Sequence, residues 1–445
     1  MPRQLPLRRL PREALRRMSP RPADTPGTPR PRLRSTAAVC TTMSALAATS
    51  LVTAPSVAEP FSPTPCALQR TDAHHSEGLD TWNAAYPRPA RSLDAVMVFL
   101  SFPDSRPRTA PAELAADHFP ATTRFFRHAS YGRFDLRPHP LHEWIPMPRP
   151  STAYDIQRDW GPEHRAAYLR DALAAADRHV DFSRYDLVYF VADPDAPGVD
   201  SDATKVVNLD TPLRADGTDI RRVVTVFENH PPDRLVLAHE TGHVFDLPDL
   251  YHRPGDGDSN GDWDTHVGDW DLMGSQFGLA PDLFAWHKWK LGWLDPRQVA
   301  CVRGSGPTRL TLEPLGAGPG VVTAGAAGAP AFGLGQGTKL AVVRTGSDSV
   351  LAFEARGPVG EDAAACRAGV LVYRVRGDTE SGGGPVQVID AHPGTEACAE
   401  DSVYPPLADA PVGVGESFTV PGDGVRVVVE GRTASGAWTV RITPG

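Results

Sequence analysis

The sequence predicts an α/β domain over residues 92–300 and an all-β, sandwich-like domain over residues 301–445. In the first region, apolar runs of strand length alternate with segments of helical period, a pattern typical of α/β folds. In the second region, short β-like runs are separated by turn residues and helical period is absent. A chain of 445 residues is long enough for two folded units with extensions.

Individual elements can be placed along both regions. The expected strands of the first region are residues 93–100, 185–192 and 222–227, and residues 130–136 predict a turn into a further strand. Its expected helices are residues 111–128, interrupted at Pro120, and 162–178. The β-like runs of the second region are residues 339–344, 350–354, 370–375, 386–389, 425–430 and 438–442. Within the second region, residues 316–337 are rich in Gly and Ala, which predicts a flexible loop.

The N-terminus has the layout of a secretory signal peptide over residues 1–58. An Arg- and Pro-rich stretch precedes an apolar run of small residues at 37–52, and small residues precede a cleavage position after Ala58. Met18 offers a second start. A basic arm that binds nucleic acid and an uncleaved membrane anchor are the alternatives. Under the signal-peptide hypothesis the mature chain is extracellular, has no stable membrane span, and begins with an arm or pro-segment over residues 59–91.

The charge balance argues against nucleic acid as a partner. The formal net charge is −9, and because ten Arg but only two acids lie in residues 1–58, the remainder carries −17. Outside the predicted signal peptide the chain has an even set of cysteines, which favours two disulfides in an exported protein: Cys66, Cys301, Cys366 and Cys398. Proximity favours the pair Cys366–Cys398, and the pair Cys66–Cys301 follows by elimination. A Cys66 thiolate that caps a metal in a latent form is the alternative.

Residues 235–251 contain the zinc-hydrolase signature H-E-x-x-H as His239, Glu240 and His243. Residues four apart lie on one face of a helix, so both imidazoles can bind the same ion. Glu240 then lies beside the metal, where it could take a proton from water. The preceding residues are apolar, as a buried helix requires, and Asp233 is a candidate N-cap. The plain alternative is a buried helix with two hydrogen-bonded histidines.

A carboxylate follows this helix at a distance that allows it to reach the same ion. Asp249 comes six residues after His243, beyond a helix break that includes Asp246 and Pro248. Asp246 must itself form the turn, whereas Asp249 has enough chain before it to return to the metal. His252 is the main rival as third ligand, and a distant Glu or His is another. His252, His266 and His287 are more typical of surface or core histidines than of ligands.

With these residues in place, the chain resembles the secreted metalloproteases of the immune inhibitor A type (peptidase family M six), which are zincins of the metzincin kind. The motifs that carry the resemblance are His-Glu-Thr-Gly-His at 239–243, Leu-Pro-Asp-Leu-Tyr at 247–251, Trp-Asp-Leu-Met-Gly at 270–274, Phe-Pro-Asp at 102–104, Ser-Tyr-Gly at 130–132, Asp-Phe-Ser-Arg-Tyr at 181–185 and Gly-Val-Leu-Val-Tyr at 369–373.

The resemblance implies a metzincin-like α/β zincin catalytic domain. In this chain His239, His243 and Asp249 would be the zinc ligands, Glu240 the general base and Met273 the methionine of the turn beneath the metal. It also implies that a peptide substrate lies extended beside the strand at residues 222–227. The family usually has Gly where this chain has Asp246. Because Asp tolerates the left-handed backbone region better than most residues, we expect a working turn.

A second candidate site begins at Asp256, where residues with side-chain oxygens occupy alternate positions and Gly261 occupies the sixth. This pattern matches the first half of an EF-hand calcium loop. Its members are Asp256, Asp258, Asn260, Asp262 and Asp264. Val267 occupies the twelfth position, where an EF-hand has Glu, so the loop is incomplete. The sequence therefore predicts either a structural calcium site or a solvated acidic loop.

The sequence analysis leads to a secreted zinc-dependent endopeptidase that acts on extracellular proteins or peptides. The alternative is a non-catalytic secreted binding protein with a structural zinc site. Glu240 favours the enzyme, because a structural zinc site needs no general base. The sequence makes no prediction of the oligomeric state.

Overall fold

The structure of the protein is a computed structural model that describes residues 64–253, 262–318 and 336–445. These residues belong to one compact unit, Ala58–Gly445. The predicted signal peptide and most of the predicted flexible loop at 316–337 lie outside the described residues. Within the described ranges, no helix is long and apolar enough to cross a membrane.

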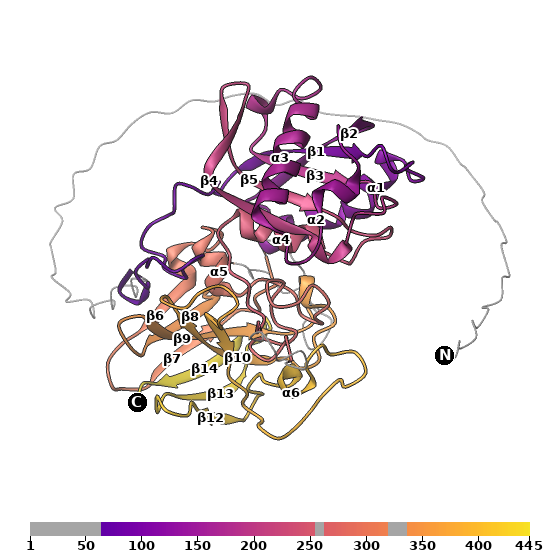
Figure 1. Ribbon diagram of the computed structural model, residues 1–445. Helices are drawn as coiled ribbons and strands as arrows, with labels where there is room; N and C mark the ends of the chain where they lie inside the picture. Colours follow the sequence, from indigo (N-terminus) through magenta and orange to yellow (C-terminus); the bar gives the residue numbers. More distant parts are fainter. Residues whose placement is uncertain (1–63, 254–261, 319–335) are drawn as a thin grey trace, which may run out of the picture. The chain divides into compact units, whose positions relative to one another are not determined.

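The first sheet has five strands in the order β2-β1-β3-β5-β4 (Figure 1). Neighbouring strands run parallel except for β4 and β5, which are antiparallel. The strands are β1 (Ser92–Ser101), β2 (Asp135–Pro146), β3 (Leu187–Ala192), β4 (Lys205–Ala215) and β5 (Thr218–Val226). The inner strands β1 and β3 are near-continuous apolar runs, because both faces of the sheet are covered.

Helices cover both faces of this sheet. The described residues as a whole contain the helices α1 (Pro111–His118), α2 (Ala121–Ala129), α3 (Pro162–Ala176), α4 (Val236–Val244), α5 (Ala285–Lys290) and α6 (Pro405–Ala408). Short 3-10 helices are η1 (Thr64–Cys66), η2 (Ser151–Tyr154), η3 (Phe182–Arg184), η4 (Ser201–Ala203), η5 (Pro296–Gln298) and η6 (Gly360–Asp362). The buried face of α3 packs against one side of β1 and β3, while α1, α2 and α4 contribute to the core on the other side.

Two further sheets are built from the C-terminal part of the chain. The second sheet has the order β11-β10-β9-β8-β6 and the third has the order β12-β13-β14-β7. Their strands are β6 (Val299–Val302), β7 (Thr308–Leu312), β8 (Leu340–Arg344), β9 (Ser349–Arg356), β10 (Gly369–Arg376), β11 (Val386–Val388), β12 (Ser417–Thr419), β13 (Arg426–Arg432) and β14 (Trp438–Thr443). One face of the second sheet and the inner face of the third share a core. The other face of the second sheet joins the core of the first sheet.

The structure differs from the sequence expectation at the strand proposed to receive substrate. Residues 222–227 fall largely in β5, which has β3 on one side and β4 on the other, so β5 has no free edge. The edge strand is β4, which the sequence analysis did not place. Polar residues and Pro212 interrupt its apolar pattern, as a partly exposed edge strand permits.

The start of α4 also differs from expectation. Its N-cap is Leu235 in a left-handed conformation, with φ 59°, and no side chain caps the helix. Asp233 instead accepts at its backbone carbonyl the N–H of Val236. The helix is nonetheless formed because every one of its residues is buried, so that tertiary packing replaces the missing cap.

Two disulfides join distant and local parts of the chain, in the pairing that the sequence predicts. Cys366 pairs with Cys398, 32 residues on, and Cys66 pairs with Cys301, 235 residues on. The second disulfide attaches the start of the N-terminal arm to β6. A free Cys66 thiolate over the metal site is therefore not present in this structure.

Candidate metal centre

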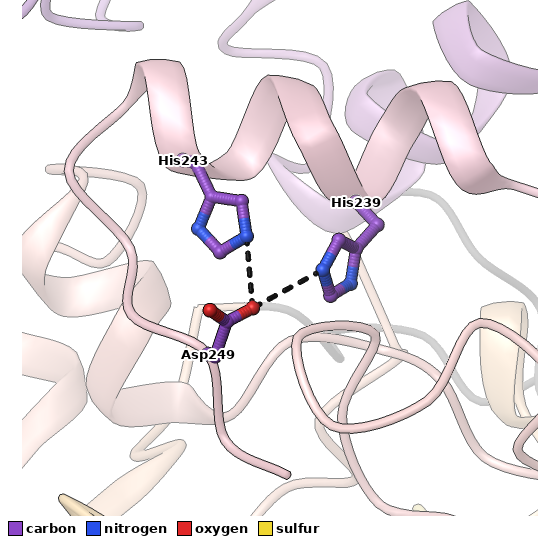
Figure 2. Close-up of side chains that lie close together, drawn as sticks. All are labelled: His239, His243 and Asp249. Carbon is purple, nitrogen blue, oxygen red and sulfur yellow. Dashed lines mark ion pairs between the residues drawn. The ribbon is translucent and has the colours of Figure 1, made fainter. Parts of the chain in front are cut away.

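Helix α4 presents two imidazoles on one face, as Figure 2 shows. His239 and His243 are one turn apart, and their ring centroids are 4.9 Å apart with the rings nearly perpendicular. Both side chains are buried. The spacing that the sequence predicts thus brings the two rings to the same side of the helix.

The chain reverses directly after α4 and brings Asp249 back to these rings. The turn residue is Asp246, which has φ 65°, and the N–H of Leu247 bonds to the carbonyl of Gly242. This is the bond pattern of a helix that ends in a left-handed residue. The Asp where the resembled family has Gly therefore does form the turn.

The carboxylate of Asp249 points at both imidazoles (Figure 2). Its Oδ1 is 3.0 Å from Nε2 of His243 and 3.4 Å from Nε2 of His239. Despite these distances, Oδ1 is buried and makes no hydrogen bond among the described residues. In the described part of the chain, these three residues are the one group of His, Cys, Asp or Glu that could hold a metal ion. His252, the rival third ligand, is not part of the group.

The tautomer of each histidine is set by a backbone carbonyl. Nδ1 of His239 lies 2.9 Å from the carbonyl oxygen of Leu272, and Nδ1 of His243 lies 2.8 Å from that of Leu247. Because a carbonyl can only accept, each Nδ1 carries the proton. Nε2 of each ring therefore faces the centre, as in metal-binding histidines, and can bind a metal when the ring is neutral.

Two opposing effects act on charge at this centre. Burial opposes ionisation, but the ion pair between His243 and Asp249 prevails: the pKa of His243 rises to about 9, and that of Asp249 falls well below its usual range. In the metal-free protein these shifts favour a protonated His243 beside an ionised Asp249. A divalent cation would compete with that proton, so that binding of the cation releases it.

Glu240 lies on the same helix between the two histidines, and it is buried. Its Oε2 accepts a hydrogen bond of 2.7 Å from the backbone N–H of Val206 in β4. Burial raises the pKa of this carboxyl, against the effect of the two histidines. A carboxylate whose affinity for protons is raised, held beside a candidate metal position, is suited to act as a general base.

Met273, the predicted methionine of the turn, is fully buried and packs against α4. A Cβ atom added at Gly242 of α4 would lie 2.4 Å from its Sδ, so the thioether packs directly against the helix backbone. The N–H of Met273 bonds to Asp271, and its carbonyl accepts the N–H of Leu250. The methionine turn therefore contacts both the ligand helix and the loop that carries Asp249.

A cavity of about 740 Å³ opens at the centre. It is bordered by the edge strand through Lys205, Val206 and Asn208, and by His74 and His75 of the N-terminal arm. The sequence analysis missed these contributions. The one local sequence signal for a role of the arm is the His-His pair at 74–75. The position of the arm at the centre depends on contacts between residues far apart in the sequence, which no local pattern predicts.

The predicted calcium loop is described only in part. Asp256, Asp258 and Asn260 lie outside the described residues. Asp262 and Asp264 are described: the N–H of Asp264 bonds to the Asp262 carboxylate, and burial together with Asp262 raises the pKa of Asp264 to about 6. Among the described residues they form no cluster of three ligands. Calcium binding stays a prediction.

Two further histidines match the structural roles expected of them. His287 is fully buried between Glu77 and Asp271. His266 packs edge-on against His252, with ring centroids 5.1 Å apart.

No protein-family model matches the chain, and no curated protein aligns with it. Two crystal structures of wild-type OgpA from Akkermansia muciniphila, in different crystal forms, show a weak structural similarity to the chain. The first has a TM-score of 0.26 and 12% identity over 82% of this chain and 95% of OgpA. The second has a TM-score of 0.24 and 10% identity over 82% and 94%. TM-scores this low do not establish a common fold.

Proposed function

We propose that the protein is a secreted zinc-dependent endopeptidase that hydrolyses peptide bonds in extracellular proteins. The observation that carries the proposal is the convergence of three ligand atoms, two Nε2 lone pairs and the unbonded, buried Oδ1 of Asp249, beside the carboxylate of Glu240. Two imidazoles and one carboxylate suit zinc. Three protein ligands leave one coordination position open, which is the pattern of catalytic rather than structural zinc sites.

When bound, zinc supplies a Lewis acid that polarises the scissile carbonyl and makes water more acidic. Glu240 accepts a proton from the attacking water and delivers it to the leaving amine, a contribution typically worth about 10²–10⁴-fold in rate. Its raised pKa favours proton acceptance. The bond from Val206 fixes the orientation of its carboxylate.

The edge strand β4 is the proposed platform for the substrate backbone. One side of β4 pairs with β5 and the other is a sheet edge, and Lys205, Val206 and Asn208 border the cavity. An extended peptide can add to such an edge through backbone hydrogen bonds, which are independent of its sequence. This assignment replaces the internal strand β5 as the docking strand.

We further propose that the first sheet and its helices form a metzincin-like α/β catalytic domain and that residues 301–445 form a β-sandwich domain. The shared core of the second and third sheets supports the second assignment. Two disulfides are consistent with an oxidising, extracellular location. A non-catalytic binding protein with a structural zinc is the second candidate, and the position of Glu240 beside the ligands speaks against it.

Hydrolysis of casein by the purified protein tests the proposal. We expect cleavage that stops on treatment with a chelator and returns on addition of zinc. A serine-protease inhibitor, used as the control, should leave the cleavage unchanged. Cleavage that persists in a chelated, zinc-free sample would show that the proposal is wrong, and so would a protein that carries one zinc per chain but cleaves no protein substrate.

A further inference from the structure

The N-terminal arm reaches the metal centre, where His74 and His75 border the cavity. After the Cys66–Cys301 disulfide, residues 70–77 turn into the interior, and His75, Ser76 and Glu77 are all buried. Buried charged and polar groups are costly unless they have partners, so the contacts of these residues report where the arm is held. We call residues 70–77 the arm segment.

The first set of contacts holds the turn after α4. Both carboxylate oxygens of Asp246 have a partner in the arm segment: Arg70 donates to Oδ2 at 2.7 Å, and Nδ1 of His75 donates to Oδ1 at 2.9 Å. The next residue along the chain, Leu247, provides the carbonyl that accepts from Nδ1 of His243. The ring of His75 is also stacked near that of His243, with centroids 5.7 Å apart and planes 24° apart.

The second set of contacts holds the methionine turn. Glu77 pairs through Oε1 with Nε2 of His287 at 2.8 Å, and Nδ1 of His287 lies 3.2 Å from Oδ2 of Asp271. Asp271 accepts the N–H of Met273 at 2.7 Å. The residue between them, Leu272, provides the carbonyl that accepts from Nδ1 of His239.

Lys290 connects the two sets. Its buried Nζ donates to the carbonyl of Ser76 in the arm segment at 2.8 Å and to the carbonyl of Asp246 at 2.6 Å. The carbonyl of Leu247, which orients His243, is therefore adjacent to Asp246, which the arm segment contacts directly. The carbonyl of Leu272, which orients His239, is adjacent to Asp271, which the arm segment contacts through His287. Removing the arm would leave Asp246, His287 and Lys290 as buried charges without these partners, which is strongly destabilising.

We propose that residues 70–77 are a permanent positioning segment of the metal centre, in which His75 and Glu77 fix the orientations of His243 and His239. This proposal rests on the proposed function only for the identity of the metal as zinc. The placement of the His239 and His243 rings does not depend on it. It also distinguishes between the two roles that the sequence allows for the arm: this part of it is retained in the active protein and is not a removable pro-segment.

Substitution of His75 tests the proposal through the affinity for zinc. Partners that orient metal ligands typically contribute about 10–100-fold to metal affinity, and we expect His75→Ala to raise the zinc dissociation constant by that factor. His75→Asn keeps an N–H donor near the position of Nδ1 and should restore most of the affinity. Asp72→Ala, an exposed residue of the same segment, is the matched control and should bind zinc like the wild type.

A cobalt-loaded sample provides a readout that a general loss of stability would not change. The visible absorption spectrum of bound cobalt depends on ligand geometry, so it should shift in His75→Ala and return toward the wild-type spectrum in His75→Asn. Zinc affinity and cobalt spectra that are the same in all four proteins would overturn the proposal.

Hydrogen exchange of the metal-free protein separates this inference from the proposed function. His75→Ala should speed exchange in residues 243–250 while residues 426–443 exchange at the wild-type rate. If His75→Ala speeds exchange in both regions, the variant Glu77→Gln is used instead. We expect Glu77→Gln to speed exchange in residues 269–275. A wild type that binds no zinc would refute the zinc assignment alone, whereas unchanged exchange at both sites would refute the positioning segment.

Discussion

At the scale of single residues, Glu240 separates catalysis from metal binding. Its carboxylate is held by Val206 and is not one of the three converging ligand atoms. We therefore expect Glu240→Gln to lower kcat by at least about 10²-fold while one zinc remains bound per chain. Casein hydrolysis and metal analysis on the same sample check this. Activity within tenfold of the wild type would refute the role of general base.

Asp246 illustrates which features of a residue can be predicted from sequence. That an Asp can occupy the left-handed turn follows from its intrinsic backbone preference, and φ is indeed 65°. That its carboxylate is fully buried and paired with Arg70 and His75 could not be predicted, because both partners lie more than 170 residues away. Long-range pairing of this kind depends on the whole fold.

At the scale of elements, α4 and the methionine turn fit closely against each other. A Cβ at Gly242 would be 2.4 Å from Sδ of Met273, which is fully buried. We expect Gly242→Ala to lower the free energy of unfolding by about 1–3 kcal/mol, the usual range for overpacking. Gly306, whose Cβ would meet nothing within 4 Å, gives the control Gly306→Ala. Urea unfolding with equal midpoints for the two variants would contradict the close fit.

The elements nearest the centre divide into those that sequence patterns can specify and those that they cannot. Every residue of helix α4 and strand β3 is buried, and an apolar run marks β3 and the start of α4, so sequence patterns predict both elements even though α4 lacks the expected Asp233 cap. Strand β4 is polar and contains Pro212, because an edge strand needs neither a continuous apolar run nor every N–H for pairing. Its place at the edge became evident only from the strand order.

At the scale of the whole molecule, the buried pair of Glu77 and His287 makes stability depend on pH. Burial lowers the pKa of His287, but Glu77 and Asp271 more than compensate and raise it to about 9. Because the unfolded pKa is about 6.5, the stabilisation is fully present below that pH and is lost as pH rises through about 9. The shift corresponds to roughly 3 kcal/mol.

A comparison with His287→Gln isolates this effect, because other groups such as Lys339, whose pKa is lowered to about 8 mainly by burial, titrate equally in both proteins. In the presence of a chelator, the wild type should exceed the variant in free energy of unfolding at pH 6.5, and the difference should shrink toward pH 9.5. A difference that stays constant over this range would show that His287 is not charged in the folded protein.

The two disulfides and the arm segment show where the predictive power of the sequence ends. The even number of cysteines outside the predicted signal peptide and their proximity in the sequence were sufficient to predict the two disulfides that the structure contains. The spacing of His239, Glu240 and His243 needs only a local helix. The positions of His75 and Glu77 need the Cys66–Cys301 link, α5 and the methionine turn together, and no local pattern encodes that combination.

The most direct test of the central claim is the zinc content of Asp249→Ala after dialysis, compared with the wild type and with His252→Ala. We expect one zinc per chain in the wild type and in His252→Ala, and none in Asp249→Ala, because the two imidazoles alone do not complete a catalytic zinc site. Full zinc occupancy in Asp249→Ala, or loss of zinc from His252→Ala with Asp249 intact, would contradict the assignment of the metal centre.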